Sequence, residues 1–314
     1  MRFTRKVGGV VMGGGGGGFS GYGSINIGAG LATSSAGVQA SQREIEINEF
    51  LESILKEING RDVEAIRRHL DEIEKTLGRE IEGLEKILFG GSISKNTFIE
   101  GASDVDALVI LDKAKYKGVS PKKLQDYFCD LLRQRFPRTE ISKGNLAVTV
   151  KFSDYEVQLL PALRENGKVR IADRGGASWT SPINTAAFTR RLTETNKSNG
   201  NKVIPAIKIA KNLLSRLPEK YQLSGYHVEA LAVDAFSAYN GRYTLYDMTK
   251  HLLDHSVNRV LSPMNDITGQ SGTIDSYFGL KNSLDRQMAS YYIKDIANRF
   301  SNSEAGSIKK ELFN

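Results

Sequence analysis

The segment from Leu88 to Leu111, LFGGSISKNTFIEGASDVDALVIL, constrains the fold more than any other part of the chain. It begins with apolar residues, passes two glycines and a serine at 90–92, and places Asp104 and Asp106 at the head of a second apolar run. The apolar runs predict two short strands, one at Phe89 and one over Ala107–Leu111. The sequence therefore predicts a strand, a turn and a second strand that is headed by two acids.

The spacing of the two aspartates predicts a metal site. Residues i and i+2 of a strand project from the same face, so Asp104 and Asp106 are expected to point the same way. Adjacent carboxylates repel each other unless a cation lies between them, and Mg²⁺ prefers oxygen ligands of this kind. A lone Asp-x-Asp is ordinarily solvated surface, but this pair precedes a run that should be buried, where acids need partners.

The turn before the acids predicts a phosphate site. Gly91 and Ser92 offer backbone N–H groups and a hydroxyl to an anion, and a helix that starts at Ser92 would direct its dipole at the same anion. A lone Gly-Gly-Ser is ordinarily only a turn. Combined with the acid pair, it predicts metal-assisted phosphoryl or nucleotidyl transfer.

The same residues carry a family resemblance. Gly91-Ser92, Thr97 and Asp104-x-Asp106 resemble the signature of the DNA polymerase β-like nucleotidyltransferases. Within them the chain is similar to the branch of oligoadenylate synthases, cyclic GMP-AMP synthase and bacterial CD-NTases. The resemblance implies an α/β fold, in which a small mixed sheet carries the acids next to a C-terminal helical lobe. It also implies that Asp104 and Asp106 hold two Mg²⁺ ions, or Mn²⁺ in their place, and that Gly91 and Ser92 bind the nucleotide.

One position departs from the family pattern. The family's third metal carboxylate precedes a proline by three residues, and here Gln158 stands at that place before Pro161. Glutamine keeps an oxygen ligand but loses the negative charge. Glu156, two residues earlier on the same face of the predicted strand, could supply that charge. A two-acid enzyme, an enzyme that recruits Glu156 and a pseudoenzyme all stay open; we favour activity, with Gln158 in the metal shell.

The resemblance continues into the helical lobe. The stretch 223–229, LSGYHVE, resembles the family segment in which a serine holds the donor triphosphate and a tyrosine stacks on its base. By position, Ser224 would bind phosphate and Tyr226 would stack. Lys208 or Lys211, which lie one helical turn apart, would neutralise the triphosphate. The alternative for Tyr226 is a core aromatic residue that precedes a helix.

Composition shifts divide the chain into three parts. Residues 1–40 form a Gly-rich flexible arm that carries the hydroxyls of Ser20, Tyr22 and Ser24. Residues 41–180 hold a helical spine, predicted helical from Ser41 to Leu88, and the catalytic core. Residues 181–314 form the helical lobe. The arm is either a tail or the source of a primer hydroxyl, with Tyr22 favoured because a phenol ionises more easily than an alkyl hydroxyl.

Charge and cysteine usage limit the partners and the setting. The net charge of +7 is typical of a protein whose substrate carries phosphate. A single cysteine excludes an internal disulfide and a cysteine-rich zinc site, and four histidines argue against a histidine-based metal site. Because no apolar run approaches the ~20 residues of a membrane span, we expect a cytoplasmic protein without membrane insertion.

The resemblance implies a metal-dependent, template-independent nucleotidyltransferase that transfers NMP or dNMP from a nucleoside triphosphate to a hydroxyl. Its product would be a nucleotide signal or a protein-primed oligonucleotide in anti-phage defence. An effector protein encoded nearby would be a partner. Two alternatives stay open: a CD-NTase-type synthase of cyclic dinucleotides or oligonucleotides, and a nucleotide-binding pseudoenzyme. Protein priming would be similar to that of the nucleotidyltransferase of the Hailong anti-phage system.

Overall fold

The computed structural model describes most of the chain from Ile27 onward. Outside the described residues lie 1–26, 61–62, 90–94, 96, 98, 100–104, 145, 153–154, 174–175, 185, 269–271, 303, 309–311 and 314. For 27–41, 60, 63–67, 89, 105–106 and 305 only the backbone is described. The chain divides into two units, residues 1–42 and 43–314.

The first unit is described from the start of α1 (Ile27–Gly60). The helix begins well before Ser41, so the predicted start of the helical spine is wrong. The flexible arm stays a prediction for residues 1–26, which lie outside the described part of the chain.

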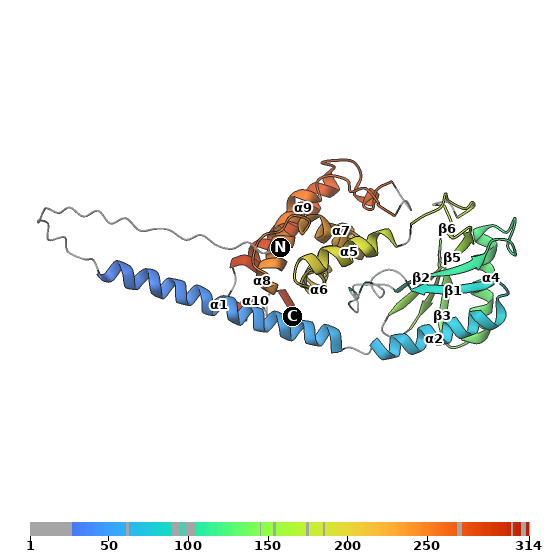
Figure 1. Cartoon of the computed structure of the whole chain (residues 1–314), viewed down its shortest axis with the longest axis horizontal. Helices are drawn as coiled ribbons and strands as arrows, with labels where there is room; N and C mark the ends of the chain where they lie inside the picture. Colours follow the sequence, from blue (N-terminus) through green and yellow to red (C-terminus); the bar gives the residue numbers. More distant parts are fainter. Residues whose placement is uncertain are drawn as a thin grey trace, which may run out of the picture. The chain divides into compact units, whose positions relative to one another are not determined.

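The six described strands of the second unit form one mixed sheet (Figure 1). They are β1 (Leu84–Phe89), β2 (Val105–Asp112), β3 (Glu140–Lys143), β4 (Val148–Lys151), β5 (Glu156–Glu165) and β6 (Lys168–Ile171). Their order is β1-β2-β5-β4-β3, with β6 paired to β5. β2 and β5 are parallel and the other pairs are antiparallel, which confirms the predicted small mixed sheet.

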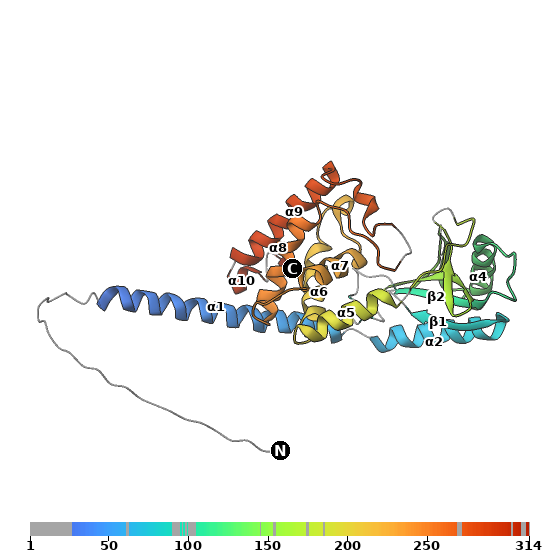
Figure 2. The ribbon, with the colours of Figure 1, turned by 45° about the horizontal axis from the view of Figure 1, so that its top comes forward.

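Two helices, α2 (Val63–Glu80) and α4 (Pro121–Arg135), pack on one face of this sheet (Figure 2). Ser120 caps α4 by accepting a hydrogen bond from the Lys123 N–H, and proline occupies the first turn, where its missing N–H costs nothing. The buried layer between helices and strands includes Ile73, Leu77, Phe128, Val109, Leu111, Val157 and Leu159.

The helix predicted to continue to Leu88 ends at Glu80 instead. Gly83 adopts a left-handed backbone conformation (φ +81°), which an α-helix cannot accommodate, and the chain then enters β1. Pairing of β1 with β2 satisfies the backbone groups that a longer helix would have satisfied internally.

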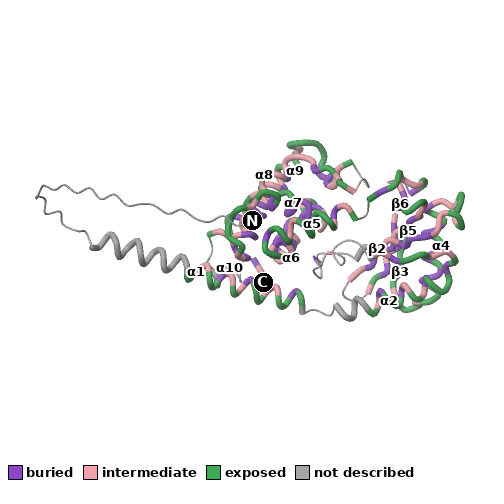
Figure 3. Tube along the Cα trace, viewed as in Figure 1, coloured by how far each residue is buried: buried purple, intermediate pink, exposed green. Residues whose placement is uncertain are grey.

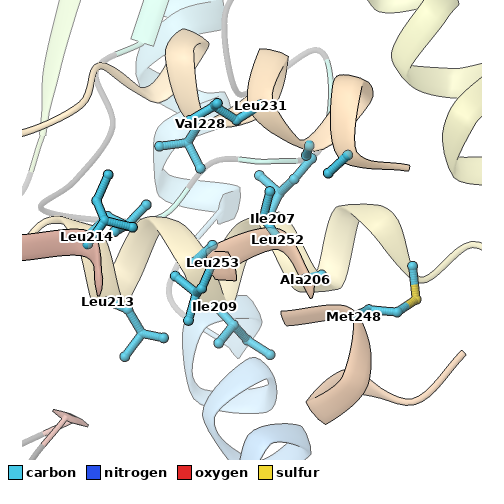
Figure 4. Packing of buried hydrophobic residues seen from close by; sticks show 14 of the residues in the cluster. Ala206, Ile207, Ile209, Leu213, Leu214, Val228, Leu231, Met248, Leu252 and Leu253 are labelled. Carbon is cyan, nitrogen blue, oxygen red and sulfur yellow. The ribbon is translucent and has the colours of Figure 1, made fainter. Parts of the chain in front are cut away.

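The second unit ends in a helical region. Its elements are α5 (Ala187–Ser198), α6 (Val203–Leu214), η1 (Glu219–Tyr221), α7 (Gly225–Ala235), α8 (Leu245–Arg259), η2 (Ser276–Phe278), α9 (Leu284–Asn302) and α10 (Ala305–Ile308). Figure 4 shows buried side chains of α6, α7 and α8 gathered in one core. Figure 3 shows buried residues both along the strands and along these helices. The α/β fold with a helical C-terminal region is confirmed. No helix among the described residues is long and apolar enough to cross a membrane.

Candidate active site

The register of the two parallel strands positions the predicted metal site. Asp106 is the second residue of β2, and its backbone position lies opposite Gln158 of β5. Gln158 also lies opposite Thr149 of β4, so it occupies the middle of three adjacent strands. Of the predicted metal ligands, Asp104 lies outside the described residues, and for Asp106 only the backbone is described.

Gln158 belongs to the sheet face that α2 and α4 leave uncovered. Along β5, Val157 and Leu159 are buried in the layer beneath those helices, and Gln158 alternates with them. Within the described part of the chain, no group of three or more His, Cys, Asp or Glu side chains could hold a metal ion. Gln158 lies directly opposite Asp106 in the strand register, so its side-chain oxygen is the described metal-ligand candidate nearest to that position.

Glu156, the alternative third ligand, lies two residues earlier on β5, opposite Lys151 of β4. Its carboxylate is 3.9 Å from the Lys151 ammonium group, and its side chain is 40% exposed. An ion pair of this exposure is weak and leaves the carboxylate free to move. The choice between Gln158 and Glu156 stays a prediction.

A buried ionic cluster lies where the segment between β1 and β2 meets the helical region. The carboxylate of Glu229 on α7 contacts the ammonium groups of Lys211, at 2.8 Å, and of Lys95. The Thr97 hydroxyl donates a hydrogen bond to the same carboxylate, and the Lys211 ammonium donates one to the Thr97 carbonyl at 3.1 Å. Burial alone would raise the pKa of Glu229, but the two ammonium groups outweigh it and hold the pKa below its usual value.

The two lysines that were predicted to neutralise the triphosphate differ in their surroundings. The Lys211 side chain is 1% exposed and is engaged in the Glu229 cluster. Lys208 is partly exposed and donates a hydrogen bond to the Asn59 side chain at 2.5 Å. Burial, followed by the charge of Lys211, lowers the pKa of Lys208. Of the two, only Lys208 is open to solvent in this structure.

Ser224 caps α7, because its hydroxyl accepts a hydrogen bond from the His227 N–H at 3.2 Å. The Ser224 N–H donates to the Tyr277 hydroxyl at 3.1 Å. The Tyr277 hydroxyl in turn lies 3.0 Å from Nδ1 of the buried His227. Burial lowers the pKa of His227 to about 4, so the imidazole is neutral at pH 7. The predicted phosphate ligand thus stands at the N-terminus of a helix, where backbone N–H groups favour an anion.

Tyr226 lies beside a pocket of about 200 Å³ that is lined by Phe188, Arg191, Tyr226, Ala230, Val233, Asp234, Arg259, Met264, Asn265 and Ile267. Its ring meets that of Phe188 edge to face at 4.7 Å, and its hydroxyl donates to Asp266 at 3.0 Å. Burial, then the charge of Asp266, raises the pKa of Tyr226, so the phenol stays protonated. The Lys95 ammonium lies 5.1 Å from the Phe188 ring centre and 5.4 Å from that of Tyr226.

Sequence reasoning assigned no role to Lys95 or Glu229, although both are central to this arrangement. Glu229 could have been found, because it is an acid within the otherwise apolar stretch VEALAV of a predicted helix. Lys95 carries no comparable signal. Gly91, Ser92, Ser20, Tyr22 and Ser24 lie outside the described residues, and their roles stay predictions.

Comparison with known proteins supplies the family. Residues 44–196 match the family described as Second Messenger Oligonucleotide or Dinucleotide Synthetase domain, SMODS. No curated protein sequence matches the chain.

Solved structures share the fold. The CdnC structure from E. coli MS115-1 with ATP is similar at a TM-score of 0.64 and 12% identity, over 84% of this chain and 95% of that chain. The DncV cyclic AMP-GMP synthase of Vibrio cholerae, in complex with a linear intermediate, is similar at 0.60 and 13%, over 92% and 91%. The CdnE c-di-GMP synthase of Capnocytophaga granulosa is similar at 0.55 and 18%, over 75% and 80%.

The narrower resemblance to the Hailong nucleotidyltransferase stays a prediction. The match of residues 44–196 to the SMODS family confirms the predicted CD-NTase branch of the DNA polymerase β-like nucleotidyltransferases, and the solved structures share its fold.

Proposed function

We propose that the protein is a nucleotide-signal synthase, which transfers a nucleoside monophosphate from a triphosphate to a hydroxyl group. The observation that carries this proposal is the register of β2 and β5, in which the backbone of position 106 lies opposite Gln158, a residue of the sheet face away from α2 and α4. The SMODS match and the similarity to CdnC with ATP and to the DncV cyclic AMP-GMP synthase support it.

The donor set at this register fits a hard divalent cation, because the described side chains there, Gln158 and Glu156, offer only oxygen ligands. Asp104 and Asp106 would hold two Mg²⁺ ions, and Gln158 would complete the shell. When bound, the ions polarise the α-phosphate and lower the pKa of the attacking hydroxyl. That hydroxyl oxygen forms a bond to the α-phosphorus, the bond to pyrophosphate breaks, and the hydroxyl proton leaves to solvent.

The helical region would hold the donor nucleotide. Ser224 and the first N–H groups of α7 would bind triphosphate oxygens, supported by the capping geometry of this helix. The base would enter the pocket beside Tyr226, which the aromatic and apolar lining suits. We assign the neutralising role to Lys208, since the Lys211 ammonium is already paired with Glu229.

The finer features of this function are part of the proposal. We expect a cytoplasmic enzyme whose signal acts on an effector protein encoded nearby in anti-phage defence. A cyclic or linear oligonucleotide and a protein-linked product remain alternatives, because the predicted primer hydroxyls lie outside the described residues.

The test is incubation with α-labelled ribo- and deoxyribonucleoside triphosphates and Mg²⁺, followed by denaturing gels and chromatography of small products. Asp106→Asn should lower incorporation by roughly 100-fold or more, since even the loss of an outer-shell metal partner costs 10–100-fold. Asp126→Asn, at an exposed position of α4, is the matched control and should retain activity. A wild-type chain that incorporates no nucleotide would support the pseudoenzyme alternative and refute the proposal.

A further inference from the structure

The Glu229 cluster joins three separate parts of the sequence at one buried carboxylate. Glu229 comes from α7, Lys211 from α6, and Lys95 and Thr97 from the segment between β1 and β2. The side chain of Lys95 is 7% exposed, and those of Lys211 and Glu229 are each 1% exposed. Few water molecules can therefore replace these contacts, and loss of Glu229 would leave two buried ammonium groups without their carboxylate.

The helical half of the cluster lies within a packed core. Val228 and Leu231 on α7 and Ile207 and Leu214 on α6 lie in the core that Figure 4 shows. Glu229 and Lys211 are thus fixed by packing on either side of their ion pair, and they form a preset acceptor for a hydroxyl and an ammonium group. The segment between β1 and β2 supplies both, from Thr97 and Lys95.

Lys95 and Thr97 lie in the sequence between the predicted phosphate turn and the predicted metal ligand Asp104, which connects the cluster to the reaction. Lys95 follows Ser92 by three residues, and Thr97 precedes Asp104 by seven. An extended backbone spans at most ~3.6 Å per residue. The anchors at Lys95 and Thr97 therefore limit how far the predicted phosphate turn at Ser92 and the predicted metal ligand Asp104 can lie from the cluster. Thr97 is held twice, by its hydroxyl to Glu229 and by its carbonyl to Lys211.

We infer that Glu229 is a positioning residue of the nucleotidyl transfer reaction. It anchors Lys95 and Thr97 to the helical region and thereby sets the placement of Gly91, Ser92 and Asp104 relative to the donor nucleotide. This inference rests on the proposed function, because it assigns to the cluster the task of aligning the metal and phosphate ligands of that reaction.

A purely structural role makes a different prediction. If Glu229 only stabilised the fold, its variants would melt at a lower temperature, but the folded fraction would keep its kcat and its Mg²⁺ requirement. A positioning role instead lowers kcat in the folded protein and raises the Mg²⁺ concentration at half-maximal rate, while the KM for the triphosphate changes less.

The experiment compares Glu229→Gln with Glu194→Gln, an exposed glutamate of α5 that serves as the matched control. Glutamine keeps the size and the acceptor oxygen but removes the charge. We expect kcat to fall roughly 10- to 100-fold, as for outer-shell metal partners, and half-saturating Mg²⁺ to rise several-fold. Hydrogen–deuterium exchange of peptides over residues 91–104 should become faster in Glu229→Gln and stay unchanged in Glu194→Gln.

Two further variants keep the test decisive if Glu229→Gln folds poorly. Thr97→Val is nearly isosteric and removes one hydrogen bond to Glu229, so it should lower kcat with little loss of melting temperature. Lys95→Gln combined with Glu229→Gln should be no slower than Glu229→Gln alone, because both act through one anchor. Normal kcat, normal Mg²⁺ dependence and unchanged exchange in folded Glu229→Gln and Thr97→Val would overturn the inference. An inactive wild type would refute the proposed function, while the exchange measurement would still decide the anchoring.

Discussion

Arg286→Met tests the buried ion pair that fixes the loop between α8 and α9. Arg286 and Asp275 are both fully buried, and the guanidinium donates to the Asp275 carboxylate and to the Val260 carbonyl, each at 2.8 Å. It also donates to the Gly279 carbonyl at 3.1 Å. Methionine fills a similar volume but satisfies none of these acceptors, and it leaves the carboxylate buried without its cation.

The magnitude follows from this burial. Removing one partner of a buried ion pair costs about 3–5 kcal/mol, because the remaining charge stays out of water. The Asp275 carboxylate retains a hydrogen bond from the Met264 N–H at 3.1 Å, so we expect the lower end, about 3 kcal/mol. At about 2–4 °C per kcal/mol for a domain of this size, the melting temperature should fall by about 6–12 °C.

The assay is urea unfolding followed by circular dichroism, together with a thermal scan. Arg299→Met is the matched control, because Arg299 pairs with Asp295 one turn away on α9 and its side chain is 44% exposed. Such a pair contributes about 0.3–0.5 kcal/mol. If Arg286→Met is no more destabilising than Arg299→Met, the assignment of a buried ion pair is refuted. Arg286→Met with Asp275→Leu should recover part of the loss, since no charge then stays buried.

Three further predictions concern the site. Gln158→Asp should keep activity and lower the half-saturating Mg²⁺ concentration, whereas Gln158→Ala should be slow. If instead Gln158→Ala keeps its activity and Glu156→Gln is inactive, Glu156 belongs to the metal shell. His227 has a pKa of about 4 in the fold against 6.5 unfolded, so stability should fall by up to about 3 kcal/mol as pH drops from 6.5 to 4, and His227→Gln should flatten this dependence in urea titrations at each pH. If Tyr22 is the first acceptor, Tyr22→Phe should lose the labelled peptide from residues 13–40 in mass spectrometry, and unchanged labelling would exclude it.

The elements that local patterns determine were predicted well. The start of α4 follows from local signals, because Ser120 caps the helix, Pro121 occupies its first turn and the apolar residues follow one face. The strand after the acid pair appears as β2, since a run of five apolar residues after a turn favours a buried strand. The mixed sheet itself followed from the family resemblance and not from these patterns.

The errors arose where long-range contacts override local preference. Residues 84–88 have a composition that suits a helix, yet they form β1 because β2 supplies an antiparallel partner. The same limit explains why Lys95 was not recognised. Its partner Glu229 lies more than 130 residues later, and no periodicity within one element can reveal a pair at that separation.

The lysines of α6 show how the structure changes the interpretation of a motif. Lys208 and Lys211 are three residues apart, which suggests a common phosphate-binding role. Lys211 is buried, however, whereas Lys208, one helical turn away, is partly exposed. Lys211 and Lys95 bring two positive charges to the single carboxylate of Glu229, and the pKa of Glu229 is accordingly held low. Burial, and after it the charge of Lys211, lowers the pKa of Lys208. Two ammonium groups against one carboxylate give the cluster an excess positive charge, which attracts a nearby anion. Lys211 can thus favour triphosphate binding through its field while its ammonium group stays bound to Glu229.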